Sequence, residues 1–188
     1  MRLEVNGVGW NVEVVGRPVH PPLLLLHGFT GTLDTWRPFV PAWKERYRLV
    51  LVDIIGHGRS DSPEDPAQYT MERVTDDLVR ILDHFKIEKT NVLGYSMGGR
   101  LALALAVSNP TRVNALILEA SSPGLADEKE RKARRESDER LAARIERDGI
   151  EAFVNEWEKI PLFATQKTLP KCVRERVRAQ RLQNSATG

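Results

Sequence analysis

The side chain best placed to do chemistry is Ser96, which stands in the pentapeptide Gly94-Tyr95-Ser96-Met97-Gly98. The pattern Gly-x-Ser-x-Gly is weak by itself, because it fixes only three positions. Here it follows an apolar stretch at residues 91–93 and opens a helical stretch that starts near Met97. A serine at such a strand–turn–helix junction is typical of a nucleophile elbow, in which small residues let the backbone turn sharply. The context favours a reactive serine over an exposed serine in a glycine-rich turn.

A second motif, His27-Gly28-Phe29-Thr30-Gly31, follows the apolar stretch at residues 23–26. By itself it would indicate only the end of a strand. Beside an elbow, it predicts that the backbone N–H groups of Phe29 and Met97 point at one spot above Ser96. Two fixed donors at that spot form an oxyanion hole, where each stabilises developing negative charge by roughly 3–4 kcal/mol.

The loop from Asp53 to Ser60 follows the next apolar stretch and contains Asp53 and His57. Both residue types occur in catalytic triads, yet both lie before the serine. Where the nucleophilic serine lies at such an elbow, the triad runs in the chain order serine, acid, histidine. We therefore interpret Asp53 and His57 as structural.

No histidine follows Ser96, because all four histidines (His20, His27, His57 and His84) precede it. A serine hydroxyl without an adjacent proton acceptor is a weak base and a weak nucleophile. We expect a C-terminally truncated chain that lacks the last strands of the fold, about 80 residues by comparison with a complete domain. We also expect most of the activity to be lost.

The surrounding pattern predicts an α/β fold in which a mostly parallel sheet is flanked by helices. Asn6-Gly7 favours a hairpin between residues 2–5 and 8–15, and four buried strands are expected at residues 23–26, 49–52, 91–93 and 115–118. Helices are expected at residues 71–85, capped by Thr70, and at residues 97–107. The six strands place the core at residues 1–122.

Residues 123–188 differ from the core in composition and are expected to form a helical lid. Residues 126–148 contain eight basic and eight acidic side chains, and four apolar residues at helical spacing follow: Ile150, Phe153, Val154 and Trp157. Pro161 and Pro170 each interrupt the helical pattern.

Composition narrows the function classes. The chain has 188 residues, 41% of them hydrophobic and 29% charged, and a net charge of +2, so neither nucleic acid nor a membrane is an expected partner. The single cysteine, Cys172, excludes an internal disulfide and fits a reducing compartment, so we expect a cytoplasmic protein. We find no metal-ligand cluster or nucleotide-binding loop and expect no cofactor. Oligomeric state is left open.

Residues 1–122 resemble the α/β-hydrolase superfamily in the motifs at residues 27–29, 53–60 and 94–99. A narrower resemblance covers essentially the whole chain. It rests on residues 94–100, on Ser122-Pro123-Gly124-Leu125, and on Phe153-Val154-x-x-Trp157-x-x-x-Pro161-Leu162-Phe163. These are similar to the 2-succinyl-6-hydroxy-2,4-cyclohexadiene-1-carboxylate synthases, lyases of menaquinone biosynthesis. The resemblance implies elimination of pyruvate from a small anionic cyclohexene carboxylate.

Arg100 supports an anionic ligand independently of the resemblance. It lies in the first turn of the helix after Ser96, where the helix dipole disfavours a cation by about 0.3–1 kcal/mol. A nearby substrate carboxylate would explain it, whereas an ordinary surface ion pair is the alternative.

The resemblance implies further substrate-contacting residues. Arg134 is one, although its helical spacing alone would make it a solvated charge. Arg181 is another, with Arg178 competing because the register is uncertain there. Trp157 and Phe163 are implied as pocket walls, although both are apolar enough to serve as lid packing as well. Tyr95 is implied as a further substrate-binding residue.

Two other functions remain open. A serine hydrolase acting on esters or thioesters would use Ser96 as a covalent nucleophile, with little need of Arg100 and Arg134. A non-catalytic fragment or binding module would fit the missing histidine, but not the otherwise intact elbow.

Overall fold

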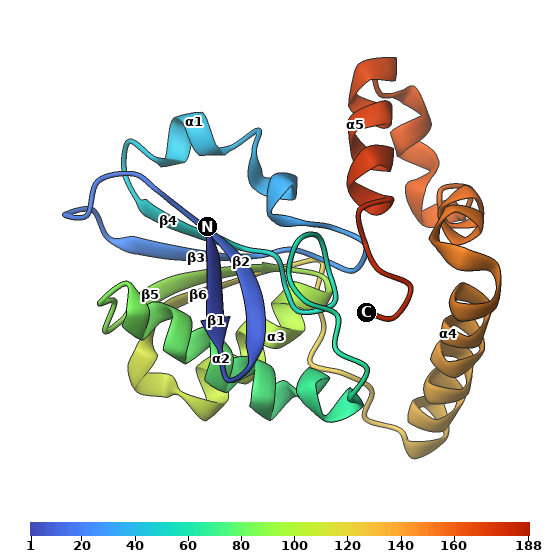
Figure 1. The fold of residues 1–188 in the computed structure, drawn as a ribbon, viewed down its shortest axis with the longest axis horizontal. Coiled ribbons are helices and arrows are strands. Elements are labelled where there is room, and N and C mark those ends of the chain that lie inside the picture. The colour runs from blue at the N-terminus through green and yellow to red at the C-terminus, as the bar shows by residue number, and fades with distance from the viewer.

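The computed structural model describes residues 1–188 and centres on one six-stranded sheet (Figure 1). The strand order is β1-β2-β4-β3-β5-β6. The strands are β1 Arg2–Val5, β2 Val8–Val15, β3 Pro22–Leu26, β4 Arg48–Val52, β5 Thr90–Tyr95 and β6 Val113–Glu119. Strand β2 is antiparallel to both β1 and β4, whereas β4, β3, β5 and β6 run parallel. The expected α/β architecture with six strands is confirmed, but β6, which was expected to be buried, is largely exposed at the edge of the sheet.

The β1–β2 hairpin closes through Asn6 and Gly7, which have φ angles of 51° and 81°. Positive φ at both central residues is what a type I′ turn requires, and asparagine and glycine tolerate it best. Val5 pairs directly with Val8, so the loop has the two residues expected.

The central strands β3 and β4 are buried on both faces. On one face, Leu24, Leu26, Val50 and Val52 pack with helices α2, Met71–His84, and α3, Met97–Ser108. On the other face, the alternate leucines of β3 and β4 pack with η1, Leu33–Trp36, and α1, Val40–Trp43. Burial on both faces explains why these strands are uninterrupted aliphatic runs.

The helix boundaries follow local signals. The Thr70 side chain accepts a hydrogen bond from the backbone N–H of Arg73 at 3.3 Å and caps α2, as expected. Helix α3 ends at Ser108, before Asn109-Pro110. Two short 3₁₀ helices complete the core, η2 Pro66–Tyr69 and η3 Pro110–Arg112.

Residues 123–188, called here the helical segment, stand beside one end of the sheet (Figure 1). The segment contains α4 Glu128–Trp157, η4 Pro161–Thr168 and α5 Lys171–Arg181. Helix α4 is bent at Gly149, whose φ of 81° and ψ of 167° are not helical. After α5 the chain returns toward the core (Figure 1). None of the helices combines the length and the apolar character that crossing a membrane requires.

Candidate active site

Ser96 lies between β5 and α3 in a conformation that few non-glycine residues adopt, with φ 53° and ψ −113°. Its N–H donates to the carbonyl of Glu119 at the end of β6 (2.9 Å), and its carbonyl accepts from the N–H groups of Gly99 and Arg100. The neighbouring strand and the first turn of α3 therefore hold this turn in place. The side chain is presented at the carboxyl edge of the sheet.

Two glycines make the elbow sterically possible. A Cβ atom on Gly98 would clash with the backbone carbonyl oxygens of Leu26 and His27, so α3 packs directly on the end of β3. A Cβ atom on Gly99 would lie 2.5 Å from the Cβ of Ser121. These contacts bring the Ser96 turn and the loop after β3 together.

The two expected oxyanion donors are the backbone N–H groups of Phe29 and Met97. The N–H of Phe29 has no hydrogen-bond partner in the structure. Met97 is the first residue of α3, where a backbone N–H lacks a partner within its own helix. Phe29, Ser96 and Met97 line the same cavity. The arrangement can receive negative charge next to a serine hydroxyl.

His27 ties the loop after β3 to the loop after β4. Its Nε2 accepts from the N–H of Ile54 at 3.0 Å, so its Nδ1, which is 2.9 Å from the carbonyl oxygen of Gly28, carries the proton and donates. Complete burial lowers the pKa of His27 to about 3, with His57 contributing to the same direction. His27 is therefore a neutral structural group at physiological pH.

Asp53 is engaged with backbone and amide donors. It accepts from the N–H groups of Leu33 (2.6 Å) and Arg59 (2.9 Å) and from the Asn11 side chain (2.8 Å). These bonds join the segment after β3 and the loop after β4 to strand β2, which agrees with its structural interpretation.

His57 lies in the wall of the cavity, with its Nδ1 3.2 Å from the carbonyl oxygen of Ile55. Burial lowers its pKa, which favours the uncharged ring. No hydrogen bond joins it to Ser96.

A cavity of about 840 Å³ lies between the carboxyl edge of the sheet and the helical segment. Its lining brings together five of the expected residues besides Met97: Phe29, Ser96, Arg100, Arg134 and Trp157. This volume is within the range of sites for small organic ligands.

The two cavity arginines differ in their pairing. Arg134 is bound through Nε to both carboxylate oxygens of Asp138, at 2.8 Å each. The half-buried Arg100 has neither an ion pair nor a side-chain hydrogen bond. Two carboxylates, Asp138 and Glu146, also line the cavity. Of its two arginines, only Arg100 lacks a protein partner.

An aromatic cluster joins the helical segment to residues 27–33, which follow β3 and are called here the oxyanion loop. The Phe29 ring lies 5.6 Å from that of Trp157, nearly perpendicular to it, and 6.1 Å from that of Phe153. Phe153 is 3% exposed and is one of only two buried apolar residues of the segment. The cavity wall is thus continuous from the sheet to α4.

Comparison with known proteins places this geometry in a family. A profile described as alpha/beta hydrolase fold matches residues 21–166. The chain is 35% identical to the 2-succinyl-6-hydroxy-2,4-cyclohexadiene-1-carboxylate synthase of Citrobacter koseri, over 98% of this chain and 68% of that protein. The chain belongs to this synthase family, within the α/β-hydrolase fold.

Other relatives support the same family assignment. The chain is 42% identical to a putative synthase of the same name from Bacillus subtilis, over 97% of its own length. It superimposes on the structure of MenH from S. aureus with a TM-score of 0.87 and 35% identity, covering 95% of this chain and 66% of that one. The chain spans 66% of the Bacillus subtilis relative and 58% of one from Klebsiella pneumoniae.

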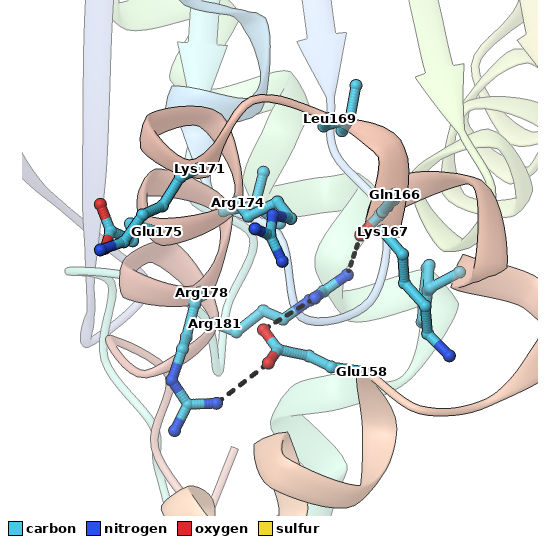
Figure 2. A pocket seen from close by; sticks show the side chains of 11 residues that line it. Glu158, Gln166, Lys167, Leu169, Lys171, Arg174, Glu175, Arg178 and Arg181 are labelled. Atoms are coloured by element: carbon cyan, nitrogen blue, oxygen red, sulfur yellow. Dashed lines mark hydrogen bonds and ion pairs between the residues drawn. The ribbon is translucent and has the colours of Figure 1, made fainter.

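Three residues that the family resemblance implied are not part of the Ser96 cavity. The ring of Tyr95 packs against Gly28, where a Cβ atom would lie 2.9 Å from its Cδ1. Phe163 and Arg181 line a separate cavity of about 390 Å³ between η4 and α5 (Figure 2).

Glu158 accounts for the position of Arg181. One carboxylate oxygen of Glu158 is 3.0 Å from Arg181, and the other is 3.0 Å from Arg178, as Figure 2 shows. Arg181 also donates to Gln166 and lies 4.6 Å from the centre of the Phe163 ring. Both candidates for the third arginine are therefore paired with protein groups.

Sequence reasoning overlooked Asn184, which contacts the oxyanion loop. Its Nδ2 donates to the carbonyl of Thr30 at 3.0 Å, across 154 positions of the chain. A lone asparagine in a polar stretch carries no local signal of such a contact. No group of His, Cys, Asp or Glu side chains is arranged to bind a metal ion.

Proposed function

We propose that this chain carries the substrate site of a lyase that eliminates pyruvate from 2-succinyl-5-enolpyruvyl-6-hydroxy-3-cyclohexene-1-carboxylate. The product is 2-succinyl-6-hydroxy-2,4-cyclohexadiene-1-carboxylate, the compound that the names of its relatives state. The observation that carries the proposal is Arg100, an arginine without a protein partner in the same cavity as Ser96. An ester hydrolase has no need of such a cation, whereas a carboxylate substrate does.

The proposed reaction begins when a general base takes the proton of the Ser96 hydroxyl and the Ser96 oxygen removes a proton from the ring. The electrons of the broken C2–H bond form the C2=C3 double bond, and the existing C3=C4 double bond shifts to C4=C5. The C5–O bond to the enolpyruvyl group breaks in the same step, and that group leaves as the enolate of pyruvate, which takes up a proton to give pyruvate. The N–H groups of Phe29 and Met97 stabilise the negative charge that develops on a substrate oxygen beside Ser96. Arg100 and Arg134 bind the carboxylates, and Trp157 covers the ring.

The helical segment serves as the lid in this proposal, and residues 1–122 serve as the catalytic core. Tyr95, Phe163 and Arg181 would reach substrate only after rearrangement, which for Arg181 means leaving Glu158. Arg178 faces the same competition from Glu158.

Turnover by residues 1–188 is expected to be slow. Ser96 requires a proton acceptor, and in this superfamily the triad acid and histidine follow the serine in chain order. Residues 97–188 contain no histidine.

Release of pyruvate from the named substrate tests the proposal. The unaltered chain should release pyruvate faster than Ser96→Ala, in proportion to enzyme concentration. Arg100→Gln should weaken substrate binding by about 10- to 100-fold, because a charge-assisted contact to a carboxylate is lost. Arg147→Gln, at an exposed site outside the cavity, should bind substrate normally. Equal binding by the Arg100 and Arg147 variants would contradict the proposal.

A serine hydrolase is the second candidate, favoured by structural likeness. The fold superimposes with a TM-score of 0.83 and 26% identity on a structure from Nitrososphaera gargenis, whose title names carboxylesterases. A hydrolase would form an acyl-serine at Ser96 during ester turnover, detectable as a mass increase. The lyase forms no covalent adduct, so accumulation of an acyl-enzyme with insensitivity to Arg100→Gln would favour the hydrolase.

A further inference from the structure

Asn184, which follows α5, bridges two loops at the carboxyl edge of the sheet. Its Nδ2 donates to the carbonyl of Thr30 (3.0 Å) in the oxyanion loop, and its Oδ1 accepts from the N–H of Gly58 (2.9 Å) in the loop after β4. The same Nδ2 donates to the carbonyl of Arg181 in the last turn of α5 at 3.1 Å. The side chain is buried, with 8% of the residue exposed.

Thr30, whose carbonyl accepts a hydrogen bond from Asn184, has a strained backbone conformation. Thr30 has a φ of 65°, in the left-handed region that β-branched residues strongly avoid. Such a conformation persists only where the surroundings impose it. Thr30 directly follows Phe29, so a change in its conformation would move the Phe29 backbone and the N–H that it carries.

We propose that Asn184 is a positioning residue that fixes the Phe29 N–H in the oxyanion hole and makes its position depend on helix α5. The inference rests on the proposed function of the Ser96 cavity. Arg181, whose carbonyl Asn184 binds, is itself paired with Glu158 at the end of α4. A displacement of α5 would therefore release the carbonyl of Thr30 and loosen the oxyanion loop.

Asparagine suits this role because it donates and accepts at one end of a short side chain. An ionised aspartate keeps the acceptor for Gly58 but loses both donated bonds. Leucine, of similar size, keeps neither. Asn184→Asp and Asn184→Leu therefore separate the contact to Thr30 from the contact to Gly58.

Amide hydrogen exchange resolved by residue provides the first test. In the oxyanion loop, the reporters are Gly31 and Leu33, whose N–H groups bond to Gly28 and Asp53. Both variants should exchange at least about fivefold faster at these amides, as expected for the loss of buried hydrogen bonds. The Gly58 amide should exchange faster in Asn184→Leu only. Gln183→Leu, the same type of change at the exposed neighbouring position, should leave all three unchanged.

Steady-state turnover of the proposed substrate provides the second test. An oxyanion donor acts on charge present in the transition state, so Asn184→Leu should lower kcat about tenfold or more while KM stays within about twofold. A rise in KM with unchanged kcat would overturn the assignment.

Two results of the hydrogen-exchange experiment would also overturn the role assigned to Asn184. One is unchanged exchange at Gly31 and Leu33 in Asn184→Leu. The other is equal acceleration of the amides of β3 together with the loop, which indicates a general loss of stability. Absence of turnover in the unaltered chain counts against the proposed function alone, and the exchange data then decide the role of Asn184.

Discussion

Ser96 combines reactivity with an unfavourable backbone conformation. Its φ of 53° and ψ of −113° place a side chain where glycine alone is comfortable. A non-glycine residue in such a region costs on the order of 1–3 kcal/mol. The bond from the Ser96 N–H to the carbonyl of Glu119 and the bond from the Arg100 N–H to the carbonyl of Ser96 maintain the conformation. At the residue scale, stability and the proposed chemistry thus oppose each other at this position.

Replacing Ser96 by Gly should therefore stabilise the protein. We expect the free energy of unfolding to rise by about 1 kcal/mol, because relief of strain exceeds the entropy that glycine adds to the unfolded chain. Ser96→Ala, which removes the hydroxyl but keeps a Cβ atom, is the matched control and should be nearly neutral. Denaturant unfolding measures both variants, and equal stability of the two would show that the turn is unstrained.

His27 predicts a pH dependence of stability. Its pKa is about 3 in the folded protein, against an ordinary value of 6.5. As the pH falls below 6.5, the unfolded chain binds a proton that the folded protein does not, so unfolding becomes more favourable. From this side chain alone, the free energy of unfolding should fall by about 1.4 kcal/mol per pH unit down to about pH 3.

Urea unfolding between pH 7 and pH 4 tests this expectation. His27→Asn removes the titrating ring and should show a shallower fall than the unaltered protein, although it is less stable at pH 7. His84→Asn changes an exposed histidine and should retain the original slope. The linkage is wrong if the slope of His27→Asn equals that of the unaltered protein.

At the scale of elements, local signals sufficed to predict most of the core. The aliphatic runs of β3 and β4, the Asn6-Gly7 turn and the Thr70 cap each depend on neighbours in sequence. The elbow was predictable for the same reason, since a serine between a strand and a helix needs glycines close by. The bend of α4 at Gly149 was not predicted, because a single glycine in a charged helix is compatible with a straight helix.

Gly98 sets how closely α3 approaches β3. Gly98→Ala should lower the free energy of unfolding by about 1–3 kcal/mol, because its methyl group would overlap the backbone carbonyls of Leu26 and His27. Turnover should fall further than stability alone explains, since α3 carries both Met97 and Arg100. Val107→Ala, at a position of α3 that is 74% exposed, is the control. Thermal unfolding compares them, and equal melting temperatures would mean that α3 can shift freely.

At the scale of the whole molecule, contacts between distant segments decide what the sequence could not predict. Arg181 was expected beside the substrate, yet Glu158, 23 positions away, pairs with it. Asn184 reaches Thr30 across 154 positions. Helical spacing describes which residues share a face, but it does not specify which distant partner that face will meet. The placement of the helical segment on the core therefore required the structure.

Buried apolar contacts are concentrated in the core, which predicts that the helical segment opens independently of the sheet. Both buried apolar clusters of the core lie within residues 5–105, whereas the segment buries only Phe153 and Val154 among its apolar residues. Units with few buried contacts open at lower free energy than the global transition. Trypsin should cut first within residues 126–148, which hold eight basic side chains in a largely exposed helix.

Phe153→Ala should accelerate this cleavage about tenfold or more, because it removes the aromatic contact with Phe29 and leaves a void at the junction. A fragment that contains the sheet should persist, since its core is unchanged. Leu162→Ala, at a position 73% exposed, should be cut at the original rate. Mass spectrometry of the digest identifies the sites. Simultaneous loss of sheet and helical segment would instead show that they unfold as one cooperative unit, in which case movement of α5 could not loosen the oxyanion loop without unfolding the core.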